Sequence, residues 1–446
     1  MKYPFIKTSL PGPKAKELLE KDKKFVSPSY TRPYPLTVKK AHGMLVEDMD
    51  GNIFLDFAGG IAVNVTGHTH PKVVEAIKKQ CEELIHMSGT DFYYAPQVIL
   101  AEKLTQIIQI KGEKKIFFGN SGTEAVEAAI KLARYYTKRP GIIAFYGSFH
   151  GRTLGSLSLT ASKAVQRKNM APFLPNVFHA PYAYCYRCLF GKEVNSCKLE
   201  CISFIKDYLL SKVAPPEDIA AIIVEPIQGE GGYNVAPEKF MKGLNDIAKE
   251  NRILLIVDEI QSGMGRTGKW FAFEHFDIDP DIVTIAKGIA SGLPLGVCAS
   301  RADIMTWEPG AHASTFGGNP VSCSAALATI DLLENGLISN AKEMGDYLLS
   351  KLYELQKDHP LIGDIRGKGL MIGVELVKDR ETKEKAKKER DKIVYKCFEK
   401  GLIILGAGEN SIRFSPPLII KKEDIDIGLE IFDKVLSDVE KEEGYR

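Results

Sequence analysis

Two largely apolar stretches of the chain end in residues that could do chemistry, one in an acid and one in an amine. Asp258 ends the run 254–258, and Lys287 directly follows the run 281–286, one helix length later. Burying either charge unpaired at the end of a core strand would cost several kcal/mol, so we expect a ligand that binds both. Pyridoxal phosphate fits, because its aldehyde forms a Schiff base with a lysine and an aspartate holds its ring nitrogen protonated.

A glycine-bearing turn within residues 117–127 predicts a cradle for the phosphate group. The turn follows a strand pattern and leads into a helix that we expect to reach about Lys138. Ser121 followed by Glu124 is a capping-box pattern, so Ser121 is the expected N-cap. The helix would point its free amides at the phosphate, and Gly122 would let the phosphate approach the backbone. Taken alone, the segment would fit a capped helix without a ligand.

A third segment places Phe149 and His150 in a glycine-rich loop after the strand pattern 142–145, where a ring could stack on a flat cofactor. The order of cradle, loop, acid and lysine resembles that of the class III aminotransferases of fold type I. This family includes 4-aminobutyrate, ornithine and acetylornithine aminotransferases, and the chain is closest in character to the first. The resemblance extends over nearly the whole chain, from residues 43–52 to residues 412–417.

The resemblance implies a role for each residue of a cofactor site. Lys287 would carry the Schiff base and Asp258 would hold the pyridine nitrogen. Gly122 and Thr123 would bind the phosphate, Phe149 would stack on the ring in place of the tyrosine of many members, and Gln261 would bond the 3-hydroxyl. The full set of expected cofactor-binding residues is Ser121, Gly122, Thr123, Phe149, His150, Asp258, Gln261, Lys287 and Thr315. Thr315 would reach the phosphate of the neighbouring subunit, which implies a homodimer or a larger homo-oligomer.

Three further residues would choose the substrate. Arg152 resembles the arginine that binds the distal carboxylate of 4-aminobutyrate or glutamate, and Arg413 the arginine that binds the α-carboxylate of glutamate. A guanidinium fork suits both contacts. Glu230 resembles the glutamate that neutralises this second arginine while an ω-amine is bound. We therefore predict transfer of an amino group from an ω-amino acid, best 4-aminobutyrate, to 2-oxoglutarate by a ping-pong mechanism.

Other functions remain open at this point. Ornithine and acetylornithine aminotransferases share the same residues, and a pyridoxal-phosphate racemase or epimerase on the same scaffold would need the same lysine and aspartate. A non-catalytic cofactor-binding protein and a decarboxylase on a related fold are further alternatives. Motifs alone do not separate a transaminase from a racemase.

The elements that position these residues predict an α/β protein. Short apolar strands alternate with amphipathic helices from about residue 73 to residue 333, which is typical of a parallel sheet covered by helices on both faces. The resemblance to fold type I implies that this sheet is mainly parallel and of the seven-stranded type. We expect a large cofactor-binding domain at residues 65–333. Residues 1–64 and 334–446 would form a smaller α+β domain, with a hairpin at residues 36–57 and a helix-like run at residues 379–400.

Composition excludes several classes of partner. The chain of 446 residues has 59 basic and 57 acidic residues, so no net field attracts nucleic acid or an anionic membrane. The N-terminus lacks the apolar stretch of a signal peptide, and no run approaches the ~20 apolar residues of a membrane span. We expect a cytoplasmic protein that binds small molecules.

Four of the eight cysteines cluster in an insertion-like segment, at Cys185, Cys188, Cys197 and Cys201. Two close pairs of thiols could bind zinc, form disulfides or stay free. The predicted chemistry needs no metal, so we assign none to the active site.

Overall fold

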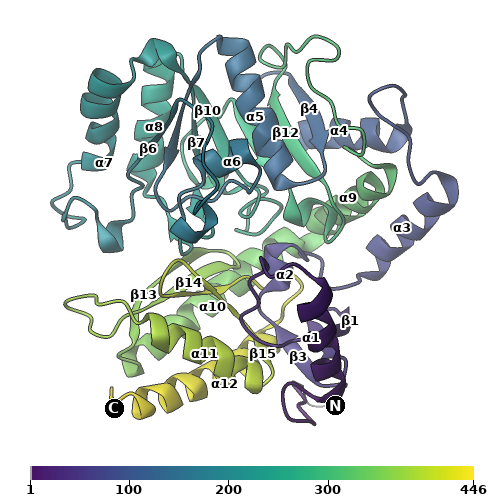
Figure 1. Ribbon diagram of the computed structural model, residues 1–446, viewed down its shortest axis with the longest axis vertical. Helices are drawn as coiled ribbons and strands as arrows, with labels where there is room; N and C mark the ends of the chain where they lie inside the picture. Colours follow the sequence, from purple (N-terminus) through teal and green to yellow (C-terminus); the bar gives the residue numbers. More distant parts are fainter. Residues whose placement is uncertain (1–2, 446) are drawn as a thin grey trace.

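The main sheet of the protein has seven strands in the order β4-β12-β11-β10-β7-β5-β6, as the computed structural model, which describes residues 3–445, shows (Figure 1). Their bounds are β4 (Lys114–Gly119), β5 (Gly141–Phe145), β6 (Val177–Ala180), β7 (Ile219–Val224), β10 (Leu254–Asp258), β11 (Ile282–Ile285) and β12 (Gly296–Arg301). Only β12 runs antiparallel to its neighbours β11 and β4. The predicted mainly parallel sheet is confirmed, and the carboxyl ends of the other strands meet at one edge.

Helices cover both faces of this sheet, which explains why its strands are apolar almost throughout. Alternate residues of β7 divide between the two faces: Ile223 packs in a cluster with α5 (Gly122–Thr137), whereas Ile222 packs in the cluster that contains α8 (Glu238–Asn251). The remaining helices of this half are α3 (Pro71–Glu83), α4 (Ala95–Ile107), α6 (Leu154–Leu159), α7 (Glu200–Ser203) and α9 (Pro320–Leu332).

Elements from both ends of the chain lie together in the other half of the molecule, drawn in purple and yellow in Figure 1. A four-stranded sheet joins β1 (Val38–His42), β2 (Leu45–Asp48) and β3 (Ile53–Asp56) to β15 (Leu402–Ile403). A second sheet contains β13 (Ile362–Lys368), β14 (Met371–Leu376), β17 (Ser411–Phe414) and β16 (Leu405–Ala407). The helices are α1 (Pro13–Phe25), α2 (Gly59–Ala62), α10 (Ile338–Asp358), α11 (Lys387–Glu399) and α12 (Lys422–Glu442). The division at residues 64 and 333 remains a prediction.

Two expectations from the sequence need adjustment. The helix-like run 379–400 is helical only from Lys387, because an isolated bridge between Val377 and Lys385 holds the preceding residues as a loop. The helical stretch Pro320–Asp358 is long and apolar enough to cross a membrane by length and composition, although no such run was expected. In the fold, α9 packs against α3 and α4.

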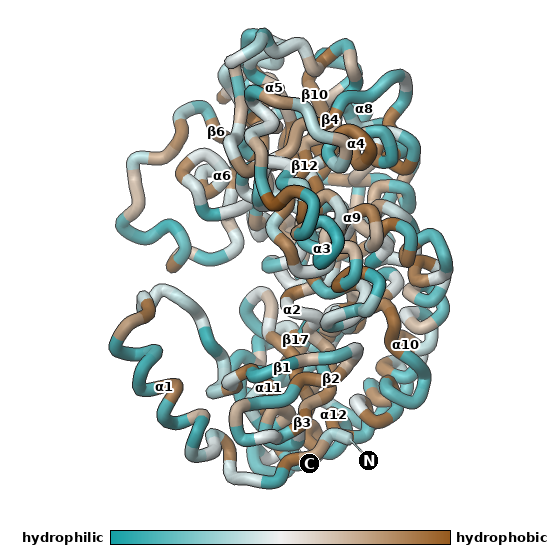
Figure 2. Tube along the Cα trace, turned by 90° about the vertical axis from the view of Figure 1, so that its right-hand side faces the viewer, coloured by the Kyte–Doolittle hydropathy of each residue, from teal (hydrophilic) through white to brown (hydrophobic). Residues whose placement is uncertain are grey.

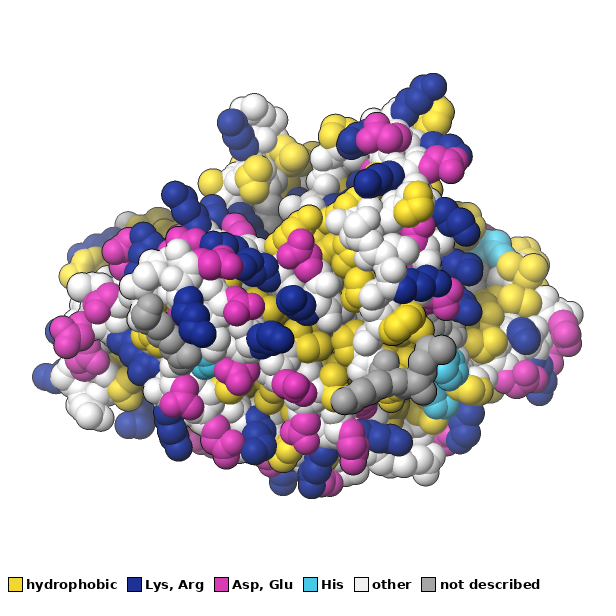
Figure 3. Space-filling model, turned by 90° about the horizontal axis from the view of Figure 1, so that it is seen from below, with side chains coloured by type: hydrophobic (Ala, Val, Ile, Leu, Met, Phe, Trp, Pro, Cys, Tyr) yellow, Lys and Arg dark blue, Asp and Glu magenta, His cyan; other side chains and the backbone are white. Residues whose placement is uncertain are grey.

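The surface of the molecule carries both signs of charge. Seen from below in Figure 3, Lys and Arg side chains alternate with Asp and Glu side chains over the half that contains both ends of the chain. In Figure 2, helix α1 and the loop after it stand away from the rest of this half. Phe25, the last residue of α1, and Tyr30, in the loop, are 74% and 64% exposed.

Candidate active site

A cavity of about 460 Å³ opens at the carboxyl edge of the main sheet. It brings together nine of the twelve residues predicted for the site: Ser121, Gly122, Thr123, Phe149, His150, Arg152, Asp258, Gln261 and Lys287. Strand ends and the loops that follow them supply these side chains, which is the usual place for a ligand in an open α/β sheet. Glu230, Arg413 and Thr315 do not line this cavity.

Lys287 begins a short turn directly after β11 and faces the cavity. Its φ of +47° is a left-handed conformation, which costs a residue with a β-carbon about 1–2 kcal/mol. Burial lowers the pKa of Lys287 to about 8, although the carboxylates of Glu230 and Asp258 oppose this effect. The strained turn thus presents an amine that is substantially neutral in mildly alkaline solution, as a nucleophile or a base must be.

Asp258, at the end of β10, is fixed from two sides. His150 Nδ1 lies 2.7 Å from Asp258 Oδ2, and the amide of Ile260 donates to Oδ1 at 3.0 Å. Burial lowers the pKa of His150, but the hydrogen bond to Asp258 raises it above the ordinary value overall. The other ring nitrogen, His150 Nε2, is buried and has no hydrogen-bond partner in the described part of the chain.

Glu225 is a cavity residue that the sequence reasoning missed. Its carboxylate accepts hydrogen bonds from the amides of Phe149 and Gly229, both at 2.9 Å. Burial raises the pKa of Glu225 to about 7, with His150 opposing and Asp258 adding to the shift. The signal was present, because Glu225 directly follows the apolar strand β7 as Asp258 ends β10.

The cradle forms at the start of α5. Ser121 Oγ accepts from the amide of Glu124 at 3.4 Å, so Ser121 is the N-cap as predicted. The reciprocal contact differs from the expected capping box, because the carboxylate of Glu124 binds Asn120 instead of the amide of Ser121. A β-carbon on Gly122 would lie 2.9 Å from the side chain of Ile260. Because Gly122 has no β-carbon, the side chain of Ile260 can pack beside it in the cavity wall. The amides at the start of the helix also stay accessible.

Three predicted side chains lie on the walls. The guanidinium of the exposed Arg152 lies 5.6 Å from the ring centre of Phe149. Gln261 accepts a hydrogen bond from Tyr233 at 2.8 Å, which orients its amide group. The hydroxyl of Thr123 lies 2.6 Å from that of Ser156 and 2.7 Å from that of Thr153.

Glu230 and Arg413 form an ion pair across 183 residues of sequence. Glu230 follows β8 (Ile227–Gln228), Arg413 lies in β17, and Arg413 Nη1 donates to Glu230 Oε1 at 2.6 Å. Burial would raise the pKa of Glu230, but Arg413 and Lys163 lower it to about 2. Arg413 Nε is buried without a partner among the described residues, so this guanidinium has donor capacity left.

Thr315 lies apart from these groups on an exposed loop, beside the exposed ring of Phe316. The single chain therefore offers Thr315 no role in its own cavity.

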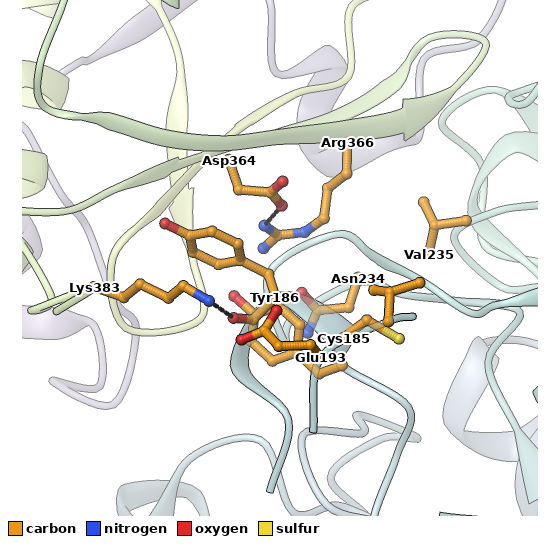
Figure 4. A pocket seen from close by; sticks show the side chains of 10 residues that line it. Cys185, Tyr186, Glu193, Asn234, Val235, Asp364, Arg366 and Lys383 are labelled. Atoms are coloured by element: carbon orange, nitrogen blue, oxygen red, sulfur yellow. Dashed lines mark hydrogen bonds and ion pairs between the residues drawn. The ribbon is translucent and has the colours of Figure 1, made fainter. Parts of the chain in front are cut away.

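The clustered cysteines lie elsewhere. All four line one small cavity of about 30 Å³, and all eight cysteines of the chain are free thiols. Within residues 3–445 no group of three His, Cys, Asp or Glu residues is arranged to hold a metal ion. A neighbouring cavity of about 340 Å³ shares Cys185 and lies between the insertion and β13 (Figure 4). Three of its charged lining residues are already engaged: Arg366 pairs with Asp364 at 2.7 Å, and Lys383 binds the carbonyl of Tyr186.

The large cavity fits pyridoxal phosphate on the chemistry of its lining. Free helix amides suit a phosphate, Asp258 suits a protonated ring nitrogen, and the buried, unpartnered Nε2 of His150 can still hydrogen-bond. Lys287 supplies the amine that this cofactor needs for covalent attachment.

Comparison with known proteins agrees with this chemistry. The class III aminotransferase family model matches residues 26–436. A leucine/methionine racemase of Thermococcus litoralis is 45% identical, over 91% of this chain and 92% of that one, and a probable 4-aminobutyrate aminotransferase of Bacillus subtilis is 40% identical, over 93% and 96%. The crystal structure of a Bacillus anthracis aminotransferase superposes with a TM-score of 0.88 at 34% identity, covering 96% of this chain and 100% of that one. The chain belongs to the class III aminotransferases, a family of enzymes that depend on pyridoxal phosphate.

Proposed function

We propose that the protein transfers an amino group from an ω-amino acid, best 4-aminobutyrate, to 2-oxoglutarate. The observation that carries this proposal is the ion pair between Glu230 and Arg413. An ω-amine has no α-carboxylate, so a buried arginine waiting for one would be left unpaired, at a high free-energy cost. With Glu230 in place, Arg413 is neutralised for the donor and becomes available for the acceptor once Glu230 moves away.

The residues of the cavity would divide the work as follows. Bound pyridoxal phosphate supplies an electron sink for the carbanion left when the substrate carbon loses its proton. Lys287 accepts that proton and returns it, and its lowered pKa of about 8 favours the neutral amine needed to accept it. Asp258, oriented by His150, holds a proton on the ring nitrogen. Arg152 binds the distal carboxylate of both substrates, and Ser121, Gly122 and Thr123 bind the phosphate.

Amino acid racemisation is the second candidate, favoured by the 45% identity to a leucine/methionine racemase. Returning a proton to the opposite face of the carbon would require an acid or base on that face. Glu230 is poorly suited, because its pKa is about 2 and its carboxylate is bound by cations on both oxygens. Glu230 is therefore not the base that a racemase would need on that face. Ornithine and acetylornithine remain possible donors, since they would use the same residues.

The active unit of this proposal is a homodimer. An exposed Thr315 outside its own cavity is consistent with a threonine that completes the site of a second subunit. The proposal is supported by the resemblance to the family and by this placement.

Single-substrate incubation tests the function. With 4-aminobutyrate and no oxo acid, the cofactor spectrum should change to that of the amine form, and 2-oxoglutarate should restore it with release of glutamate. With L-leucine or L-alanine alone, sustained formation of the D-isomer would instead identify a racemase. A protein that did neither with a broad panel of amines would be a cofactor-binding protein without this activity.

A further inference from the structure

The carboxylate of Glu230 touches a second cation besides Arg413. Its Oε1 binds Arg413 at 2.6 Å, and its Oε2 lies 3.5 Å from the Nζ of Lys163. The side chain of Arg413 is 7% exposed and that of Lys163 is 38% exposed. Glu230 therefore lies between a buried cation and a cation at the solvent boundary.

This arrangement bears on the step at which Arg413 must be released. When 2-oxoglutarate or glutamate binds, its α-carboxylate needs the guanidinium that Glu230 occupies. Glu230 would then be a largely buried carboxylate without its strongest partner, and an unpaired buried charge is costly. Unless another cation pairs with Glu230, the free-energy cost of displacing its carboxylate would weaken the binding of the dicarboxylate substrate.

We propose that Lys163 is the second partner of Glu230 and holds its carboxylate while Arg413 binds the α-carboxylate of the acceptor. This inference rests on the proposed function and adds a specificity-determining residue to it. Lys163 is a positioning residue, since it acts through Glu230 and is not among the residues that line the cofactor cavity. A rotation of Glu230 that breaks the contact with Arg413 can keep the contact with Lys163.

The loop that carries Lys163 is held in place for this role. Arg167 donates to three carbonyl groups within residues 157–160, at 2.7 to 3.1 Å, where α6 ends. Ala161 exchanges two backbone hydrogen bonds, one with Gly147 and one with Ser148, in the loop that leads to Phe149. The backbone before Lys163 is thus fixed to the cavity wall, while its long side chain is free to follow Glu230.

Binding of unreactive carboxylates to the holoenzyme tests the inference apart from turnover. Glutarate has the two carboxylates of 2-oxoglutarate without the oxo group, and valerate has only one. Isothermal titration calorimetry should show that Lys163→Met weakens glutarate binding by roughly two- to fivefold, the range of a partly exposed ion pair. Valerate binding should be unchanged, and Lys163→Arg should restore glutarate binding. Lys168→Met, in an exposed lysine of the same loop, is the matched control.

The two half-reactions give a second readout. Lys163→Met should raise the KM for 2-oxoglutarate by the same two- to fivefold. The rate of the half-reaction with 4-aminobutyrate should equal that of the wild type within experimental error. Equal changes for both carboxylates, or no change for glutarate, would overturn the role of Lys163. If the wild-type enzyme accepts no amino group from 4-aminobutyrate, the proposed function fails, whereas the contrast between glutarate and valerate still decides whether Lys163 assists the release of Arg413.

Discussion

The floor and the gate of the site are built differently. The floor consists of Lys287, Asp258, His150 and Glu225, which all lie at or just after the ends of strands in one sheet. The gate consists of Glu230, Arg413 and Lys163, which come from a loop after β8, from β17 in the other sheet, and from a loop after α6. Hydrogen bonds hold Asp258, His150 and Glu225 of the floor in place, whereas ion pairs join the residues of the gate.

This difference indicates how one cavity could serve two substrates. Proton transfer needs groups held in a fixed geometry, and the ends of parallel strands supply it. The proposed donor has no α-carboxylate, whereas the proposed acceptor has one. A site that binds both in turn needs a positive charge, here that of Arg413, that is neutralised for the first and accessible for the second. Substitutions that remove one part at a time should separate their effects.

The largest effect is expected at the floor from Lys287→Ala. Loss of the group that attaches the cofactor and moves the proton should lower kcat by about four decades or more. The melting temperature of the apoprotein should change little or rise, because the replaced lysine adopts a strained φ of +47°. Steady-state kinetics would measure kcat, and thermal unfolding would measure the melting temperature. Lys212→Ala, at an exposed lysine, is the control. Borohydride reduction of the wild type should label Lys287, and a label on another lysine would refute the assignment.

A smaller loss at the floor is expected from Asp258→Asn. The amide keeps the size of the side chain but cannot hold a proton on the ring nitrogen or the charge-assisted bond to His150. We expect kcat to fall by roughly two to three decades for both half-reactions alike, as for loss of one electrostatic group. Stopped-flow kinetics with each substrate would measure the ratio. A loss confined to one half-reaction would mean that Asp258 acts on substrate choice and is not part of a common floor.

The floor was easier to predict from the sequence than the gate. Asp258 and Lys287 end apolar runs, so the polarity pattern alone marks them, and the family resemblance gave them roles. Glu225 follows the same pattern and could have been found. Glu230 lies in the loop after β8 and Arg413 in β17, 183 residues later in the sequence, so no periodicity relates them. Lys163 carries no local signal at all, because its place beside Glu230 depends on how the loop after α6 packs.

At the gate, Glu230→Gln should separate the two half-reactions. Arg413 would be left uncompensated whenever no α-carboxylate is present, while glutamate would still neutralise it. Losing a charge-assisted partner costs about 1.5–3 kcal/mol, so the 4-aminobutyrate half-reaction should slow by roughly one to two decades more than the glutamate half-reaction. Single-turnover measurements with both donors test this ratio. Equal losses would assign Glu230 a structural role and remove the main support for an ω-amino donor.

The smallest expected effect connects the two parts through the pKa of Lys287. Burial lowers this pKa to about 8, so the neutral, reactive amine increases as pH rises through 8. Covalent capture of pyridoxal phosphate by the apoprotein should therefore accelerate about tenfold from pH 7 to pH 9 and then level off, as the neutral fraction does. An ordinary exposed lysine would instead keep accelerating to pH 10.

Glu230 raises the pKa of Lys287, so the gate should influence the floor electrostatically. The substitution Glu230→Gln removes the carboxylate that raises the pKa of Lys287. The positive charge of Arg413, which lowers this pKa, remains, so the pKa of Lys287 should fall. The inflection of the capture rate should move to lower pH, and the rate near pH 7 should increase. Lys163→Met leaves the charge of Glu230 in place and should leave the inflection nearly where it is in the wild type. An unchanged inflection in Glu230→Gln would show that floor and gate are electrostatically independent, and the gate would then act on substrate binding alone.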